Sequence, residues 1–170
     1  INVIPDDLIS QMGKSVICEN EDNFDAAIWH MERAFEVQPS DSKIQNELRR
    51  LFGLRDGVAP QKTRLTRGVL VRMYARGELY PQAIAEIRAA LAEDPQRIDL
   101  EVIQARMYYL LEQNSDAVDI CNRLLGKLPY LYEANRIMAA LAAKSPNPQE
   151  AEIYLQRIGD LDPYARHLTS

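Results

Sequence analysis

Residue types that often perform catalysis or hold metals are few in this sequence, and they lie far apart. His30 and His167 have no local partner at metal-ligand spacing. Cys18 and Cys121 belong to no CxxC pair, which argues against zinc and thioredoxin-type chemistry. We interpret them as two thiols in a reducing compartment, with a single disulfide as the alternative.

The chain also lacks the short motifs that mark common enzymes. It contains no GxGxxG, GxxxxGK[ST], GxSxG or HExxH pattern. Neighbouring carboxylates occur at Glu93-Asp94 and at Glu150 with Glu152, where helix ends and solvated faces explain them. No group of residues meets the geometric requirements of a catalytic site. The sequence therefore predicts a protein that is not an enzyme and has no cofactor and no metal.

Composition narrows the class further. The 170 residues are 46% hydrophobic and 26% charged, with a formal net charge of −5. These values are typical of a globular chain and argue against intrinsic disorder. No apolar run approaches the roughly 20 residues of a membrane span. The acidic balance argues against nucleic acid as a partner, because phosphate binding needs a clustered positive surface. We expect a cytoplasmic protein.

Three prolines reveal an internal repeat. Pro95, Pro129 and Pro163 are spaced by 34 residues. The residues that precede each proline by the same distance are also alike. Alanine stands twelve positions before (Ala83, Ala117, Ala151), an apolar residue eight before (Ile87, Cys121, Leu155) and another five before (Ala90, Leu124, Ile158). We interpret Cys121 as a small core residue for this reason.

An earlier, less regular copy precedes these three. Pro39 has Ala27, Met31 and Ala34 at the same three distances before it. The interval from Pro39 to Pro95 is longer than one repeat, so an irregular copy or an insertion lies between them. Helical spacing around Trp29 favours a core or inter-helix position for the only tryptophan over a role as a ligand anchor.

The repeat resembles the tetratricopeptide repeat (TPR), whose 34-residue copy is a pair of antiparallel helices. The best match is Leu70-Val71, Tyr74, Ala83, Ile87, Ala90 and Pro95. The signature tryptophan is absent, and Arg67, Glu101 and Asn135 stand at its positions. The resemblance implies an all-α fold, in which the helix pairs form a right-handed superhelical array. The spacing and the proline and glycine breaks predict helices near 5–18, 23–37, 41–53, 61–76, 80–93, 97–112, 114–127, 130–144 and 147–159.

This organisation divides the chain into four parts. Residues 1–53 form a helical segment with one degenerate repeat (about 8–39) and an extra helix, and residues 54–60 form a hinge. Residues 61–165 hold three regular copies, and 166–170 form a tail that looks like the start of a further helix. Because the chain starts at Ile1 and ends just after a repeat proline, we expect a processed product or a piece of a longer protein, or a partner that covers this end.

Charge suggests where a partner would bind. Residues 61–76 hold five basic side chains and no acid, although residues 1–62 carry seven basic and eleven acidic ones. In the family the first helix of each pair lines a concave groove, which implies that Arg72, Arg106 and Arg136 point into it with Tyr109 beside them. Arg76 continues the basic helix. Arginines there favour an acidic or carboxylate-bearing peptide. A solvated face balanced by nearby acids is the alternative interpretation.

The function we predict is a non-catalytic scaffold that binds a partner peptide or subunit in the concave groove. One alternative is a structural subunit held permanently in a larger assembly. Another is a regulatory module of a longer enzyme or sensor.

Overall fold

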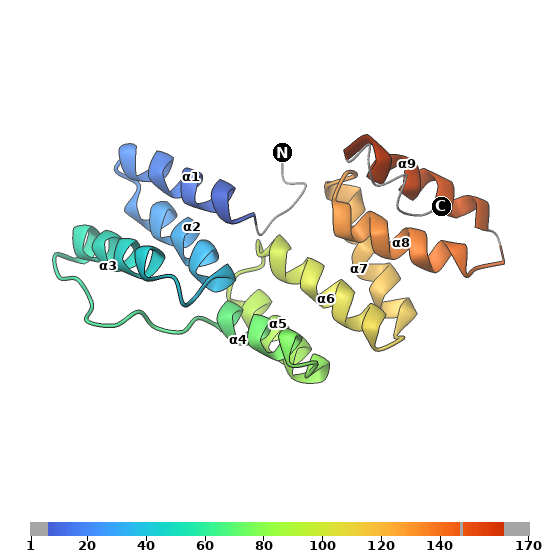
Figure 1. Cartoon of the computed structure of the whole chain (residues 1–170), viewed down its shortest axis with the longest axis horizontal. Helices are drawn as coiled ribbons and strands as arrows, with labels where there is room; N and C mark the ends of the chain where they lie inside the picture. The colour runs from blue at the N-terminus through green and yellow to red at the C-terminus, as the bar shows by residue number, and fades with distance from the viewer. Residues whose placement is uncertain (1–6, 147, 162–170) are drawn as a thin grey trace. The chain divides into compact units, whose positions relative to one another are not determined.

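The regular elements of the protein are all helical (Figure 1). The computed structural model describes residues 7–146 and 148–161, and no strand occurs within these ranges. The helices are α1 (Leu8–Asn20), α2 (Phe24–Val37), α3 (Ser42–Asp56), α4 (Arg67–Arg76), α5 (Tyr80–Glu93), α6 (Ile98–Leu110), α7 (Asn114–Lys127), α8 (Tyr132–Ala143), the 3-10 turn η1 (Pro148–Glu150) and α9 (Ala151–Leu161). The all-α prediction is confirmed. Of the helices described, none is long and apolar enough to cross a membrane.

These elements divide into two compact units, which we describe separately. Residues 7–82 form the N-terminal unit and residues 83–161 the C-terminal unit, so the division falls inside α5. In the N-terminal unit α2 packs against α1, α3 and α4, and Figure 1 shows α1, α2 and α3 side by side. Its core consists of buried apolar side chains from α2, α3 and α4, among them Met31, Leu48 and Val69. Burying a side chain of this size is worth about 1.5–3 kcal/mol.

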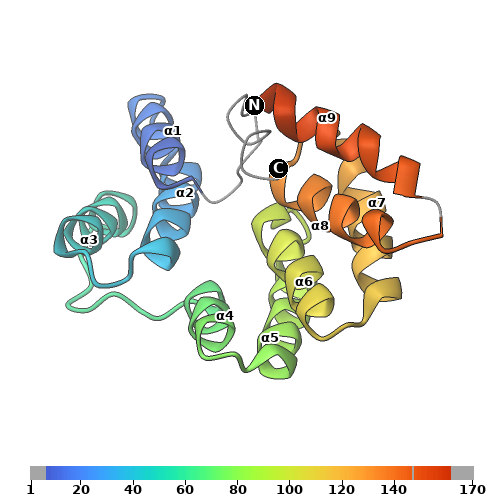
Figure 2. The same ribbon diagram turned by 45° about the vertical axis from the view of Figure 1, so that its right-hand side comes forward.

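The C-terminal unit is a succession of helix pairs. α6 packs against α7 and α8, α7 packs against α8, and α8 packs against α9. Figure 2 shows α9 lying along α8. Of the core positions that the repeat predicts inside this unit, seven are buried: Ala83, Ile87, Ala90, Ala117, Cys121, Leu124 and Ala151. Ile158 is only half-buried. Leu155 is 47% exposed although it is in register with Ile87 and Cys121, because α9 is the last helix described and no later described helix covers it.

The 34-residue period is visible in the helix boundaries. α5, α7 and the combined segment of η1 and α9 start at residues 80, 114 and 148 and end at residues 93, 127 and 161. α6 and α8 start at residues 98 and 132. The sequence period therefore corresponds to a period of local structure, with one pair of helices in each copy.

The turns within the pairs are also repeated. Asp22, Glu78 and Glu112 each adopt a left-handed backbone, with φ of 56°, 58° and 59°. The next residue in each turn donates its N–H to a carbonyl five positions earlier, as in the bond from Leu79 to Tyr74 at 2.9 Å. This is a Schellman-type helix end, which glycine usually occupies. A left-handed backbone is energetically unfavourable for acidic residues, and glycine at these positions would avoid this strain.

The connection after α2 resembles the one after α7. The Gln45 side chain donates to the Pro39 carbonyl oxygen at 2.6 Å, and the Asn135 side chain donates to the Pro129 carbonyl oxygen at 2.9 Å. Both donors lie six residues after the proline. Asn135 is fully buried. In both connections a side-chain amide thus holds the preceding turn.

Several helix ends differ from the prediction. The helix expected at 61–76 begins at Arg67, because Thr66 is its N-cap and accepts from the Val69 N–H. The helix expected at 41–53 continues to Asp56, because Gly57, with φ of 79°, provides the left-handed cap. The N-cap Asp7 likewise sets the start of α1. Pro163, His167 and the tail 166–170 lie outside the described residues.

Candidate functional site

The five arginine and tyrosine residues predicted to bind a partner belong to two different units. Arg72 and Arg76 are on α4 in the N-terminal unit. Arg106 and Tyr109 are on α6, and Arg136 is on α8, in the C-terminal unit.

Arg72 is a buried residue of the interface between α2 and α4. It is only 8% exposed, and its Nη1 lies 3.8 Å from Glu36 Oε2. Glu36 is itself 1% exposed. Its Oε1 accepts hydrogen bonds from Arg33 Nη2 at 2.9 Å and from Thr66 Oγ1 at 2.7 Å. The carboxylate therefore joins two arginines and the N-cap of α4.

Gly68 makes room for this carboxylate. A Cβ added at Gly68 would overlap the Glu36 side chain, so the first turn of α4 can approach α2 only where a side chain is missing. The negative charge also lies where the helix dipole of α4 is positive. Arg33 is held further by Trp29, whose ring centroid lies 4.8 Å from the guanidinium carbon. Sequence reasoning did not identify Glu36 as important.

Arg76 contacts α2 as well. Its Nη2 donates to the Val37 carbonyl oxygen at 3.3 Å, at the end of α2 where carbonyl groups lack helical partners. Arg76 remains exposed, whereas Arg72 does not. Two of the three arginines of α4, Arg72 and Arg76, thus stabilise the packing of α4 on α2, which accounts for much of the basic charge of this helix.

The C-terminal unit presents a different surface, formed by neighbouring helices α6 and α8. Arg106 is exposed and forms no ion pair with any described residue. Arg136 forms a forked contact with Glu133, with Nε to Oε2 at 2.9 Å and Nη2 to Oε1 at 2.7 Å. These hydrogen bonds, with the charges of Glu133, Tyr109 and Tyr132, raise the pKa of Arg136. Tyr109 and Arg136 thus lie on two helices that pack against each other.

Lys144 joins this surface, and sequence reasoning missed it. Its ammonium nitrogen lies 6.0 Å from the centroid of the Tyr109 ring, within the range of a cation–π contact. Lys144 lies 34 residues after Leu110, which is the neighbour of Tyr109. The repeat register could therefore have predicted that Lys144 lies near Tyr109. We call Arg106, Tyr109, Arg136 and Lys144 the α6/α8 face.

Acidic groups at the start of α6 do not cancel this positive charge locally. Asp99 accepts two hydrogen bonds from Arg97 at 2.8 Å each, and both residues are buried. Glu101 lies 3.6 Å from Arg123 of α7. Their charges are already compensated. Glu133 pairs with Arg136, and Glu112 lines a pocket with Tyr109 and Lys144, so the α6/α8 face has three cations against two acids.

The thiol and imidazole groups show the effect of burial. Burial raises the pKa of the Cys121 thiol to about 12, with a further contribution from the charge of Glu133. Desolvation, followed by the charges of Lys14 and Arg33, lowers the pKa of His30. His30 Nδ1 lies 2.8 Å from Gln11 Oε1. Among the described residues, no cluster of three or more histidine, cysteine or acidic residues is arranged to hold a metal ion.

Comparison with known proteins does not assign this chain to a family. No family model matches this chain, and no curated protein is significantly similar to it.

Proposed function

We propose that this chain is a tetratricopeptide-like scaffold whose helix pairs form a superhelical array and that it binds an acidic segment of a partner protein on the α6/α8 face. The proposal rests on two exposed cations: Arg106, three residues before Tyr109 on α6, and Lys144, whose ammonium nitrogen lies 6.0 Å from the Tyr109 ring centroid. An array of this kind contributes a surface for recognition and no chemistry of its own.

The repeated local structure supports the array. Helices α5 and α7 start and end 34 residues apart, and α6 contacts both its own partner α7 and the first helix of the next pair, α8. Each copy therefore buries its apolar stripe against a neighbour. First helices that lie next to each other present one continuous surface, which is suited to an extended segment.

The chemistry of the α6/α8 face supports an acidic ligand. The Arg106 guanidinium has a planar set of donors that matches a carboxylate, and it forms no ion pair among the described residues. Arg136 already forms an ion pair with Glu133, and a partner carboxylate would bind to the same guanidinium group beside Glu133. Tyr109 adds a half-buried ring with apolar area.

The experiment uses the full chain and a labelled peptide of glutamate and serine, with a lysine and serine peptide as its counterpart. Binding is followed by fluorescence anisotropy. The test variant is Arg106→Glu/Lys144→Glu. The control variant is Lys43→Glu/Lys127→Glu, which reverses two exposed lysines elsewhere and gives the same change in net charge. Arg72 is unsuitable for substitution because reversing a buried charge would disrupt folding.

We expect the acidic peptide to bind better than the basic one and to lose affinity as salt increases. The test variant should bind at least about tenfold more weakly, since it removes two favourable charge contacts and adds two repulsive ones. Equal affinity of the test and control variants would contradict binding at the α6/α8 face.

A further inference from the structure

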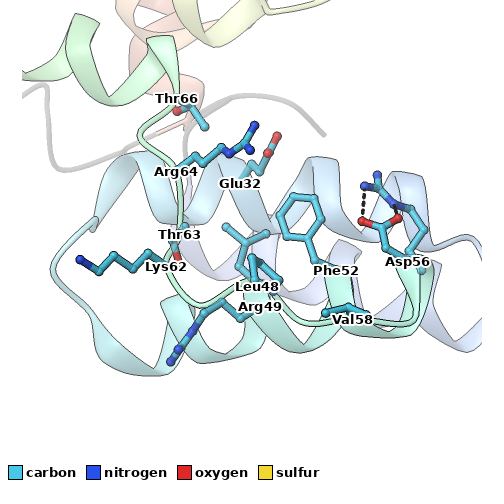
Figure 3. A pocket seen from close by; sticks show the side chains of 12 residues that line it. Glu32, Leu48, Arg49, Phe52, Asp56, Val58, Lys62, Thr63, Arg64 and Thr66 are labelled. Atoms are coloured by element: carbon cyan, nitrogen blue, oxygen red, sulfur yellow. Dashed lines mark hydrogen bonds and ion pairs between the residues drawn. The ribbon is translucent and has the colours of Figure 1, made fainter.

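The N-terminal unit contains a cavity of about 420 Å³ between α3 and the segment 57–66 that follows it (Figure 3). This volume falls within the range of natural ligand sites. The apolar walls come from Leu48 and Phe52 of α3 and from Val58 and Pro60 of the segment. Figure 3 shows Phe52 and Leu48 next to each other at the centre of this group.

The cavity exists because α3 has no helical partner on this side. α3 packs on α2 with one face, but Gly57 and Pro60 end the helix and prevent a second one from following directly. An irregular segment crosses α3 in its place. An irregular segment covers less apolar area than a helix would, so a space remains beside Phe52.

The backbone of this segment is available for hydrogen bonding. Residues 58–65 make no hydrogen bond to any other backbone group of the described chain. One carbonyl in this stretch, that of Gln61, accepts from Arg49 Nη1 at 3.3 Å. An extended peptide that lies alongside can therefore pair with N–H and C=O groups of this segment that have no backbone partner among the described residues.

The surroundings of the cavity are positively charged, although the front of the chain is acidic. Four basic residues line it, against two acidic ones: Arg49, Arg55, Lys62 and Arg64, with Glu32 and Asp56. The acids already have partners. Glu32 lies 3.4 Å from Arg33, and Asp56 accepts from Arg55 at 2.7 Å, a pair drawn at one end of the cavity in Figure 3.

Two of the four cations are uncommitted. Lys62 and Arg64 are exposed, and neither forms an ion pair with a described residue. Arg55 is fixed by Asp56 and Asp25 and lies over the Phe52 ring, with its guanidinium carbon 5.0 Å from the ring centroid. The ring is thus held in place, and Lys62 and Arg64 remain to attract a negative charge.

We propose that this cavity binds a short acidic peptide segment of a partner protein, which inserts one large apolar side chain beside Phe52. Its backbone pairs with residues 58–65, and its carboxylates meet Lys62 and Arg64. This site is separate from the α6/α8 face and does not depend on it. The unpaired backbone favours a peptide over a small anion, because a small anion would use the charges and leave the backbone groups unmatched.

The test measures binding of a labelled peptide with one central phenylalanine between glutamates to the full chain that carries Arg106→Glu/Lys144→Glu. That background removes the other proposed site. Val58→Trp is designed to fill the cavity, since Val58 is 76% exposed and lines it. Lys62→Glu/Arg64→Glu reverses the uncommitted charges. Leu54→Trp is the matched control, at an exposed position of α3 that does not line the cavity.

We expect about tenfold weaker binding or more for Val58→Trp, because burial of one aromatic anchor is lost. A similar loss is expected for Lys62→Glu/Arg64→Glu and for a peptide with serine in place of phenylalanine. Leu54→Trp should bind like its parent. Unchanged affinity in both cavity variants, or no binding by the parent, would overturn the proposal. So would full competition by phenylacetate alone, which would indicate a site for small aromatic acids.

Discussion

Replacing Glu36 by glutamine should destabilise the N-terminal unit strongly. The Glu36 side chain is completely buried, and the side chains of Arg33 and Arg72 beside it are 7% and 9% exposed. Glutamine keeps an acceptor for Thr66 but leaves both guanidinium groups without this countercharge. Removal of one partner from a buried ion pair typically costs about 3–5 kcal/mol. Because Arg33 keeps a contact with Glu32 at 3.4 Å, we expect a loss near 3 kcal/mol.

Urea denaturation of the full chain measures this loss. Trp29 is the only tryptophan and lies against Arg33, so its fluorescence reports on the N-terminal unit. A loss of this size should lower the midpoint by about 1–3 M urea. The control is Glu47→Gln, which breaks an exposed pair with Arg50 and should cost at most about 1 kcal/mol. If the two variants are equally stable, the buried carboxylate does not join α2 to α4.

Three further predictions concern single residues. Glu78→Gly should raise the thermal midpoint, by relieving about 0.5–1 kcal/mol of left-handed strain at φ of 58°; an unchanged or lower midpoint would contradict this. In the folded chain, a thiol reagent should modify the half-buried Cys18 much faster than Cys121, whose buried thiol has a pKa raised to about 12. His30 should make the free energy of unfolding fall in acid. Its pKa is lower in the folded chain, so the unfolded chain binds the proton more readily. The stability that neutral His30 contributes is fully present above its ordinary pKa of 6.5 and is lost as the pH falls below 6.5. In His30→Gln the urea midpoint should change less than in the parent chain between about pH 7.5 and about pH 5.

Much of the helical structure follows from local sequence. Alanines at positions 83, 117 and 151 keep one register with the prolines that end each copy, and all three are buried. Such positions are predictable because helix periodicity and proline geometry act within a few residues. Helix boundaries that depend on a capping residue were harder to predict from the sequence. The choice of Gly57 over Gly53 as the end of α3 depends on which glycine adopts the left-handed backbone.

The candidate site was harder to predict because its residues pair across long stretches of chain. Arg72 has the register of a groove residue, yet it is buried against Glu36. Nothing local indicates that Glu36 will lie over Gly68. The α6/α8 face was partly predicted, since the repeat register brings Tyr109 and Arg136 onto neighbouring helices. Lys144 was not predicted, because it is the C-cap of α8 and lies just outside the helix on which Arg136 was placed.

The most direct test of partner binding is an NMR titration of the isotope-labelled full chain with the peptide of glutamate and serine. We expect the largest chemical-shift changes at Arg106, Tyr109, Arg136 and Lys144, and a loss of these changes in Arg106→Glu/Lys144→Glu. Shift changes centred on the outward faces of α7 and α9, or none anywhere at saturating peptide, would contradict binding on the α6/α8 face.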